Sequence, residues 1–180
     1  MRVISGKYKG KKIYTPRRKI KPTSSVVRKA IFDFLGDFIE GKKVLDLYAG
    51  TGALGIEALS RGADKVVFVE KDFLCVQAIE KNVSQFKDGQ TEIVYLDVIT
   101  ALGLLKGSKF DVVFMDPPYK ESVIKSVLKE LLNCDIVKSS SVVVVEHHKK
   151  EVIRNEVGDF ILLKQKKYGE TVISVFQISQ

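Results

Sequence analysis

Strand-type and helix-type segments alternate along most of this 180-residue chain. Short apolar runs, typical of buried strands, are followed by stretches in which apolar residues recur at helical spacing. This alternation predicts an α/β fold, in which a mostly parallel sheet is covered by helices on both faces. We expect strands at 44–47, 65–70, 93–96, 110–115 and 141–145, and helices at about 24–39, 53–59, 72–83 and 121–132, with a short helix after Asp97.

The two ends of the chain carry different patterns. Residues 160–167 and 171–178 are β-patterned and flank a Tyr-Gly-Glu turn, so we expect a C-terminal antiparallel hairpin. Near the start, Gly6, Gly10 and Pro16 alternate with β-type residues and predict a small basic hairpin. We therefore divide the chain into an N-terminal arm at 1–21 and an α/β domain at 22–180.

Positive charge is concentrated in the first thirty residues. They contain eleven lysines and arginines and no acid, whereas the rest of the chain has more acids than bases. Clustered cations indicate a polyanionic partner, although a solvated arm has the same composition. The candidate nucleic-acid contacts are Arg2, Lys7, Lys9, Lys11, Lys12, Arg17, Arg18, Lys21 and Arg28. A second cluster, Lys164–Lys167, fits either an RNA contact or a solvated face.

The sequence argues against several other classes of protein. It contains no apolar run of the length that spans a bilayer and no secretory signal pattern, so we expect a cytoplasmic protein without a membrane partner. Cys75 and Cys134 are far apart and lack the spacing of metal ligands, and we expect no metal.

A glycine-rich turn at residues 46–55, DLYAGTGALG, joins an expected strand to an expected helix. Gly50, Gly52 and Gly55 satisfy the dinucleotide-binding pattern, and Glu70 lies twenty residues further on, where an acid binds ribose hydroxyls. This pattern alone fits a nicotinamide cofactor, S-adenosylmethionine or a simple tight turn.

Two further acids favour S-adenosylmethionine. Asp46 precedes the glycines, where it suits an ammonium group but would repel a pyrophosphate. Asp97 follows the third expected strand, where it can accept from an adenine amine. The expected cofactor-binding residues are Asp46, Ala49, Gly50, Gly52, Glu70, Asp97 and Val98.

The sequence Asp116-Pro117-Pro118-Tyr119 follows an apolar strand and is expected at the same sheet edge as the glycines. Two prolines fix the backbone and remove two N–H groups, which leaves the Asp116 carboxylate and the Pro117 carbonyl as acceptors. An exocyclic amine that donates to both acceptors can direct its lone pair at a methyl donor, while Tyr119 stacks on the base. We expect Asp116, Pro117 and Tyr119 to be the catalytic residues.

With these motifs, the chain resembles the bacterial 16S ribosomal RNA guanine-N2 methyltransferases. Lys21 stands where that family usually has arginine, and Ser24-Ser25 replaces a more usual Thr-Asp. The resemblance rests on residues 2–6 with Gly10, 21–23 with Arg28 and Phe32, 46–62, 116–119 and 168–171. It implies a Rossmann-like methyltransferase fold with a seven-stranded sheet, and ribosomal RNA in an assembled or partly assembled small subunit as the substrate.

Other functions remain open on the residues alone. The same acid-Pro-Pro-aromatic chemistry serves adenine N6 of DNA, another RNA amine or a protein glutamine amide. The three glycines also fit a nicotinamide oxidoreductase, and the arm alone fits a non-catalytic RNA-binding module.

Overall fold

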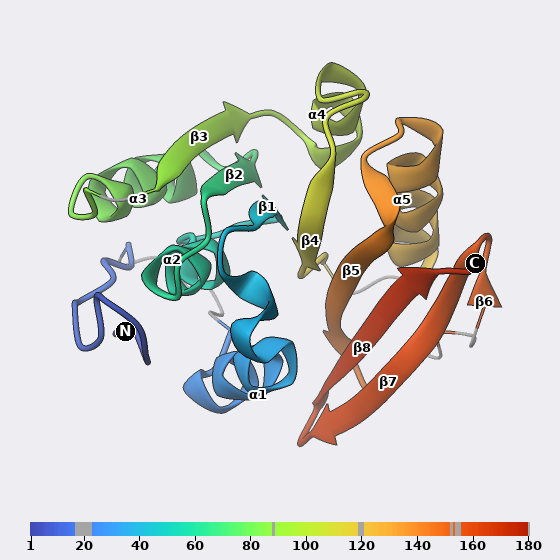
Figure 1. Ribbon diagram of the computed structural model, residues 1–180, viewed down its shortest axis with the longest axis horizontal. Coiled ribbons are helices and arrows are strands. Elements are labelled where there is room, and N and C mark those ends of the chain that lie inside the picture. Colours follow the sequence, from blue (N-terminus) through green and yellow to red (C-terminus); the bar gives the residue numbers. More distant parts are fainter. Residues whose placement is uncertain (17–22, 88, 119–120, 152, 154–155, 180) are drawn as a thin grey trace.

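A computed structural model describes residues 1–16, 23–87, 89–118, 121–151, 153 and 156–179. Within these residues, eight strands form one mixed sheet in the order β3-β2-β1-β4-β5-β8-β7-β6 (Figure 1). The strands are β1 (Lys43–Leu47), β2 (Lys65–Glu70), β3 (Gln90–Tyr95), β4 (Phe110–Met115), β5 (Val137–His148), β6 (Glu156–Val157), β7 (Phe160–Tyr168) and β8 (Thr171–Ile178). The α-helices are α1 (Ser25–Leu35), α2 (Ala53–Ser60), α3 (Phe73–Val83), α4 (Val98–Leu104) and α5 (Glu121–Asn133), and a 3₁₀ turn (Gly36–Ile39) follows α1.

The sheet is parallel from β3 to β5 and antiparallel beyond it. The central strands β1, β2 and β4 are buried along most of their length because helices cover both faces of the sheet. Helices α1, α2 and α3 contribute to the core on one face, and α4 and α5 to the core on the other. The predicted α/β class and the terminal antiparallel hairpin are confirmed.

The expected number of seven strands is wrong by one short strand. The additional strand, β6, pairs with the start of β7 through two residue pairs, Glu156 with Ile161 and Val157 with Phe160. A two-residue edge strand is too short to produce an alternating pattern that sequence reading could detect. Strand β5 is also longer than expected, since it begins at Val137 and ends at His148.

The N-terminal segment, residues 1–16, packs against the sheet's helical cover. A single antiparallel bridge joins Arg2 to Lys12, so the expected hairpin is present only as a bridged loop without assigned strands. Val3 and Ile13 are buried in the core shared with α1 and α2. The boundary expected at residues 21–22 lies outside the described residues.

Hydrogen bonds fasten this segment to α2. The buried Glu57 carboxylate accepts from the backbone N–H groups of Ile4 and Ser5 at 2.8 and 3.0 Å. The Ser60 hydroxyl accepts from the Tyr8 N–H at 3.0 Å. The segment is thereby held against α2, the helix that follows the glycine turn. None of the described helices is long and apolar enough to cross a bilayer.

Candidate active site

The candidate site lies where the order of the strands reverses. Strand β1 has β2 on one side and β4 on the other, so the segments that follow β1 and β4 diverge and leave a crevice at the carboxyl edge. A cavity of about 300 Å³ occupies this position. It is lined by Thr23, Asp46, Tyr48, Ala49, Gly50, Thr51, Ala53, Leu54, Glu70, Lys71, Cys75, Asp116 and Pro118.

The three glycines of the turn have different structural roles. Gly50 has a positive φ of 56°, and a Cβ added there would meet no atom within 4 Å, so its backbone borders open space. A Cβ on Gly55 would overlap the Phe68 ring, so Gly55 permits close packing of α2 on β2. Gly52 caps α2 in a left-handed conformation with φ of 77° and is not among the cavity-lining residues.

Asp46 is buried at the end of β1 and borders the cavity. One carboxylate oxygen accepts from the Gly55 N–H at 2.9 Å, which ties the strand to the start of α2. Burial, together with the smaller effect of the neighbouring Glu70 charge, raises the pKa of Asp46 to about 8 against the opposing effect of the Gly55 hydrogen bond. The pKa values of buried acids are raised because the charged form loses hydration. A cationic group in the cavity would favour the ionised form of Asp46.

Glu70 holds the glycine turn in place from the end of β2. One of its oxygens accepts from the Gly50 N–H at 2.8 Å, and the other accepts from the N–H groups of Lys71 and Asp72, each at 2.8 Å. A carboxylate offers about four acceptor positions, so Glu70 retains capacity for one ligand hydroxyl.

Asp97 and Val98, both expected to bind the cofactor, are not among the residues that line the cavity. Asp97 is exposed and caps α4, where its oxygens accept from the Thr100 N–H at 3.1 Å and the Thr100 hydroxyl at 2.5 Å. Burial and the charge of Asp97 together raise the pKa of Tyr48, which does line the cavity. Tyr48 has a φ of 58°, an uncommon conformation for a bulky residue and one that concentrates at functional sites.

The two expected hydrogen-bond acceptors, the Asp116 carboxylate and the Pro117 carbonyl, directly follow β4. Asp116 and Pro118 line the cavity, and Pro117 is buried between them. Since Leu47 and Met115 are paired in register, the turn after β1 and the motif after β4 begin at the same level of the sheet. Tyr119, the fourth residue of the motif, lies outside the described residues.

Comparison with known proteins assigns the family. Residues 1–177 match the family model described as conserved hypothetical protein 95. The chain belongs to this family.

Ribosomal RNA small subunit methyltransferase D of Haemophilus influenzae is 31% identical, over 98% of this chain and 93% of that protein. The Bacillus subtilis protein YlbH is 33% identical over 98% of each chain. The solved structure of Escherichia coli yhhF superposes with a TM-score of 0.90 at 28% identity, covering 99% of this chain and 98% of that one. The α/β methyltransferase fold and the resemblance to the small-subunit ribosomal RNA methyltransferases are thus confirmed.

The basic residues expected to bind nucleic acid divide into three groups. Arg2, Lys7, Lys9, Lys11 and Lys12 are exposed on the N-terminal segment. Lys11 donates to the Gln85 carbonyl at 2.7 Å, which holds the segment against the end of α3. The expected contacts Arg17, Arg18 and Lys21 lie outside the described residues.

Arg28, which was expected to contact nucleic acid, is buried instead. Its side chain is only 1% exposed, so in this conformation it cannot reach a nucleic acid. Its guanidinium donates to the Arg2 carbonyl at 3.0 Å and lies 4.0 Å from the Glu57 carboxylate. Arg28 is therefore a buried partner of the acid that fastens the N-terminal segment. The charge of Arg28 suggested a surface role because its acidic partner lies 29 residues away in the sequence.

The structure also adds residues that sequence reading missed. Thr23, Tyr48, Lys71 and Cys75 line the cavity, although none of them was expected to bind a ligand. Only proximity to a motif could have indicated them: Tyr48 belongs to the glycine turn, and Lys71 follows Glu70. Across the described residues, no cluster of three or more His, Cys, Asp or Glu side chains is arranged to hold a metal ion.

Proposed function

We propose that this protein transfers a methyl group from S-adenosylmethionine to the exocyclic N2 amine of a guanine in 16S ribosomal RNA. The observation that carries the proposal is the joint lining of one cavity by the glycine turn, Glu70 and Asp116. The names of the relatives support ribosomal RNA as the substrate, and the choice of guanine N2 comes from the sequence resemblance.

The chemistry of the cavity suits S-adenosylmethionine, which carries an ammonium group, a sulfonium group and a ribose diol. Three acids, Asp46, Glu70 and Asp116, surround the space, and a cationic ligand compensates their charges. The open side of Gly50 admits the ligand close to the backbone. We assign one ribose hydroxyl to the remaining acceptor position of Glu70 and the ammonium group to Asp46. When bound, the cofactor supplies an electrophilic methyl group.

Asp116 and Pro117 act on the other reactant. The N2 amine of guanine has two N–H donors and a delocalised lone pair that is a poor nucleophile. Donation of one N–H to the Asp116 carboxylate and the other to the Pro117 carbonyl orients the amine and frees its lone pair. The nitrogen forms a bond to the methyl carbon as the sulfur–carbon bond breaks, and the nitrogen then loses a proton to Asp116 or to water. A paired base has to leave its stack to reach this position.

A transfer assay with two competing acceptors tests the proposal. Labelled S-adenosylmethionine is incubated with the protein, small-subunit particles that lack the modification, and duplex DNA. We expect label in the ribosomal RNA only. Label in adenine of the DNA would replace the proposal by the DNA alternative, and absence of label from both acceptors would reject it.

A further inference from the structure

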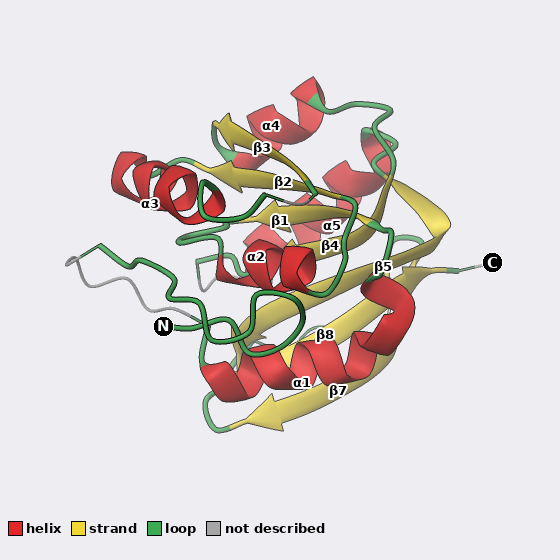
Figure 2. Cartoon of the chain, turned by 60° about the vertical axis from the view of Figure 1, so that its left-hand side comes forward, coloured by secondary structure: helices red, strands yellow, loops and turns green. Residues whose placement is uncertain are grey.

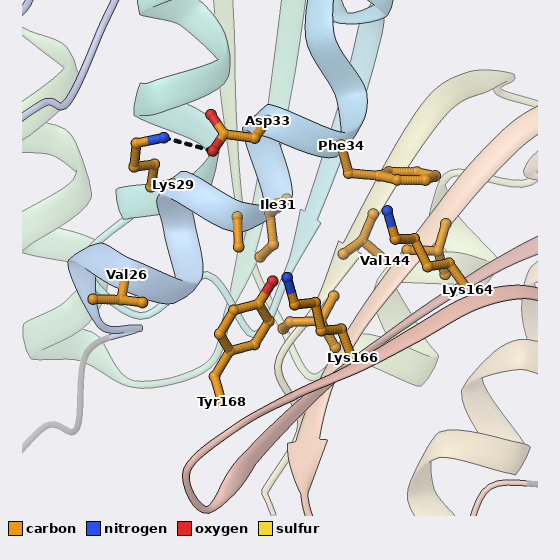
Figure 3. Close-up of a pocket in the computed structure, with 12 residues that line it drawn as sticks. Val26, Lys29, Ile31, Asp33, Phe34, Val144, Lys164, Lys166 and Tyr168 are labelled. Carbon is orange, nitrogen blue, oxygen red and sulfur yellow. Dashed lines mark hydrogen bonds and ion pairs between the residues drawn. The ribbon is translucent and has the colours of Figure 1, made fainter.

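A second hollow lies between α1 and the β7–β8 hairpin, apart from the candidate active site. Its volume is about 390 Å³, within the usual range of roughly 300–1,000 Å³ for ligand pockets. The floor is apolar and includes Ile31, Val144 and Val175. Phe34 and Tyr168 form part of its walls, with Phe34 37% exposed. We call this hollow the hairpin groove (Figure 3).

Lysine side chains reach into the hairpin groove from β7. Lys164, Lys166 and Tyr168 lie two residues apart, so their side chains share one face of the strand. The Lys164 ammonium is 5.0 Å from the centre of the Phe34 ring, and the Lys166 ammonium is 5.5 Å from the centre of the Tyr168 ring. Figure 3 shows both ammonium groups directed toward α1.

These two lysines have no acidic partner in the part of the chain that the structure describes. A third lysine of the groove, Lys29, is neutralised by Asp33 at 2.6 Å on the same helix. Both side chains are exposed, and their contacts with the aromatic rings leave the ammonium groups open to an anionic ligand. Apolar and aromatic surface beneath unpaired ammonium groups matches a nucleotide, which has a flat base and a phosphate.

The position of the groove connects it to the reaction centre. Tyr168 pairs with Thr171, and Thr171 pairs with His148 at the carboxyl end of β5, so this end of the hairpin lies at the active edge of the sheet. On the opposite side of the groove, α1 begins two residues after Thr23, which lines the candidate active site. Helix α1 lies between the basic N-terminal segment and β7 (Figure 2). Basic surface therefore flanks α1 on both sides.

We propose that the hairpin groove binds a nucleotide of the RNA substrate outside the reaction centre. The base packs against Phe34 and Tyr168, and the neighbouring phosphates contact Lys164 and Lys166. The inference rests on the proposed function, because it assigns a further part of the same substrate. It extends the RNA-binding surface across α1, from the N-terminal segment to β7.

The test compares two double variants that remove equal charge. In the groove variant, Lys164→Met and Lys166→Met keep the aliphatic length of both side chains but remove the ammonium groups. In the control variant, Lys106→Met and Lys129→Met remove two exposed lysines near α4 and α5, on the opposite face of the sheet. Binding of purified 16S RNA is measured over a range of salt concentrations, together with methyl transfer to particles and binding of S-adenosylmethionine.

We expect the groove variant to bind RNA about tenfold more weakly than the control variant, with a salt dependence reduced by roughly 0.7 in log–log slope per lost phosphate contact. Its KM for particles should rise while kcat at saturation and cofactor binding stay unchanged. Equal RNA binding by both variants would overturn the inference while leaving the proposed function intact. A loss confined to particles, with binding of purified RNA unaffected, would assign the groove to a protein partner and also overturn it. Failure of the unmodified protein to methylate RNA would instead reject the proposed function.

Discussion

The Asp46 carboxylate accepts a hydrogen bond from the Gly55 N–H at 2.9 Å, nine residues further along the chain. This contact joins the end of β1 to the first turn of α2 and fixes the glycine turn between them. It also buries an ionisable group at the edge of the candidate cofactor cavity. The energetic consequences of that burial can be measured.

Asp46 should make the ligand-free protein less stable as the pH rises. Its pKa is about 8 in the folded state, against about 3.9 in unfolded chains, so the folded state binds the extra proton between these values. The contribution of this group to the free energy of unfolding is therefore complete below about pH 4, and it is lost as the pH rises to about 8. Asp46→Asn, whose amide oxygen can still accept from Gly55, should remove this decrease. Urea unfolding of both proteins at several pH values provides the measurement, and identical pH profiles would show that Asp46 is ionised when folded.

Alanine at Gly50 and at Gly55 should have different effects. Gly55→Ala places a methyl group against Phe68, and overpacking of this kind costs about 1–3 kcal/mol of stability. Gly50→Ala has space but retains a positive φ, which costs about 1 kcal/mol, and its methyl group points into the cofactor cavity. We expect Gly50→Ala to weaken S-adenosylmethionine binding more than Gly55→Ala, and Gly55→Ala to lower the unfolding temperature more. Calorimetric titration and thermal unfolding separate the two effects, and the reverse order in either would contradict these roles.

Removal of Glu57 should release the N-terminal segment. Its fully buried carboxylate holds Ile4 and Ser5 and lies beside Arg28 and Arg61. Glu57→Ala leaves Arg28 buried without its acidic partner, and loss of one member of a buried pair costs about 3–5 kcal/mol. The control is Glu80→Ala on the exposed side of α3, expected within about 0.5 kcal/mol of the unmodified protein. Chemical denaturation gives both values, and a Glu57 effect as small as that of Glu80 would show that the pair does not anchor the segment.

Asp116→Ala should stop methyl transfer without preventing cofactor binding. The substitution removes one of the two acceptors that orient the target amine, together with a group able to take its proton. General acid–base groups contribute about 10²–10⁴-fold to rates, so we expect at least a hundredfold lower kcat. The dissociation constant of S-adenosylmethionine should change little, because we assign the contacts of the cofactor to the glycine turn, Asp46 and Glu70. A variant with unchanged kcat would show that Asp116 has another role.

The sequence predicted those parts of the site that depend on local motifs. The glycine turn, Glu70 and the Asp-Pro-Pro motif each lie at the carboxyl end of a strand, and the carboxyl ends of parallel strands meet at one edge of a sheet. The features that sequence reading missed depend on contacts between distant segments. Arg28 is buried because Glu57 and Arg2 surround it, and the isolated sequence reveals neither contact.

The attachment of the N-terminal segment was unpredictable for the same reason. The Asn82 side-chain oxygen accepts a hydrogen bond from the Tyr14 N–H at 2.7 Å. Its amide nitrogen donates to the carbonyls of Tyr14 and Thr51 at 3.0 Å each. One buried amide thus joins the basic segment, α3 and the glycine turn. Asparagine in the last turn of an amphipathic helix gives no sequence signal for such a bridge. The hairpin groove likewise forms only when β7 packs beside α1.

The most direct test of the central claim is the chemical identity of the methylated nucleoside. Small-subunit particles lacking the modification are incubated with the protein and S-adenosylmethionine, the 16S RNA is digested to nucleosides, and the products are separated by chromatography and identified by mass. The proposed function predicts one new product, N2-methylguanosine, whose rate of formation is at least a hundredfold lower when the Asp116→Ala protein is used. A methyl group on any other atom, or no methylated nucleoside, would contradict it.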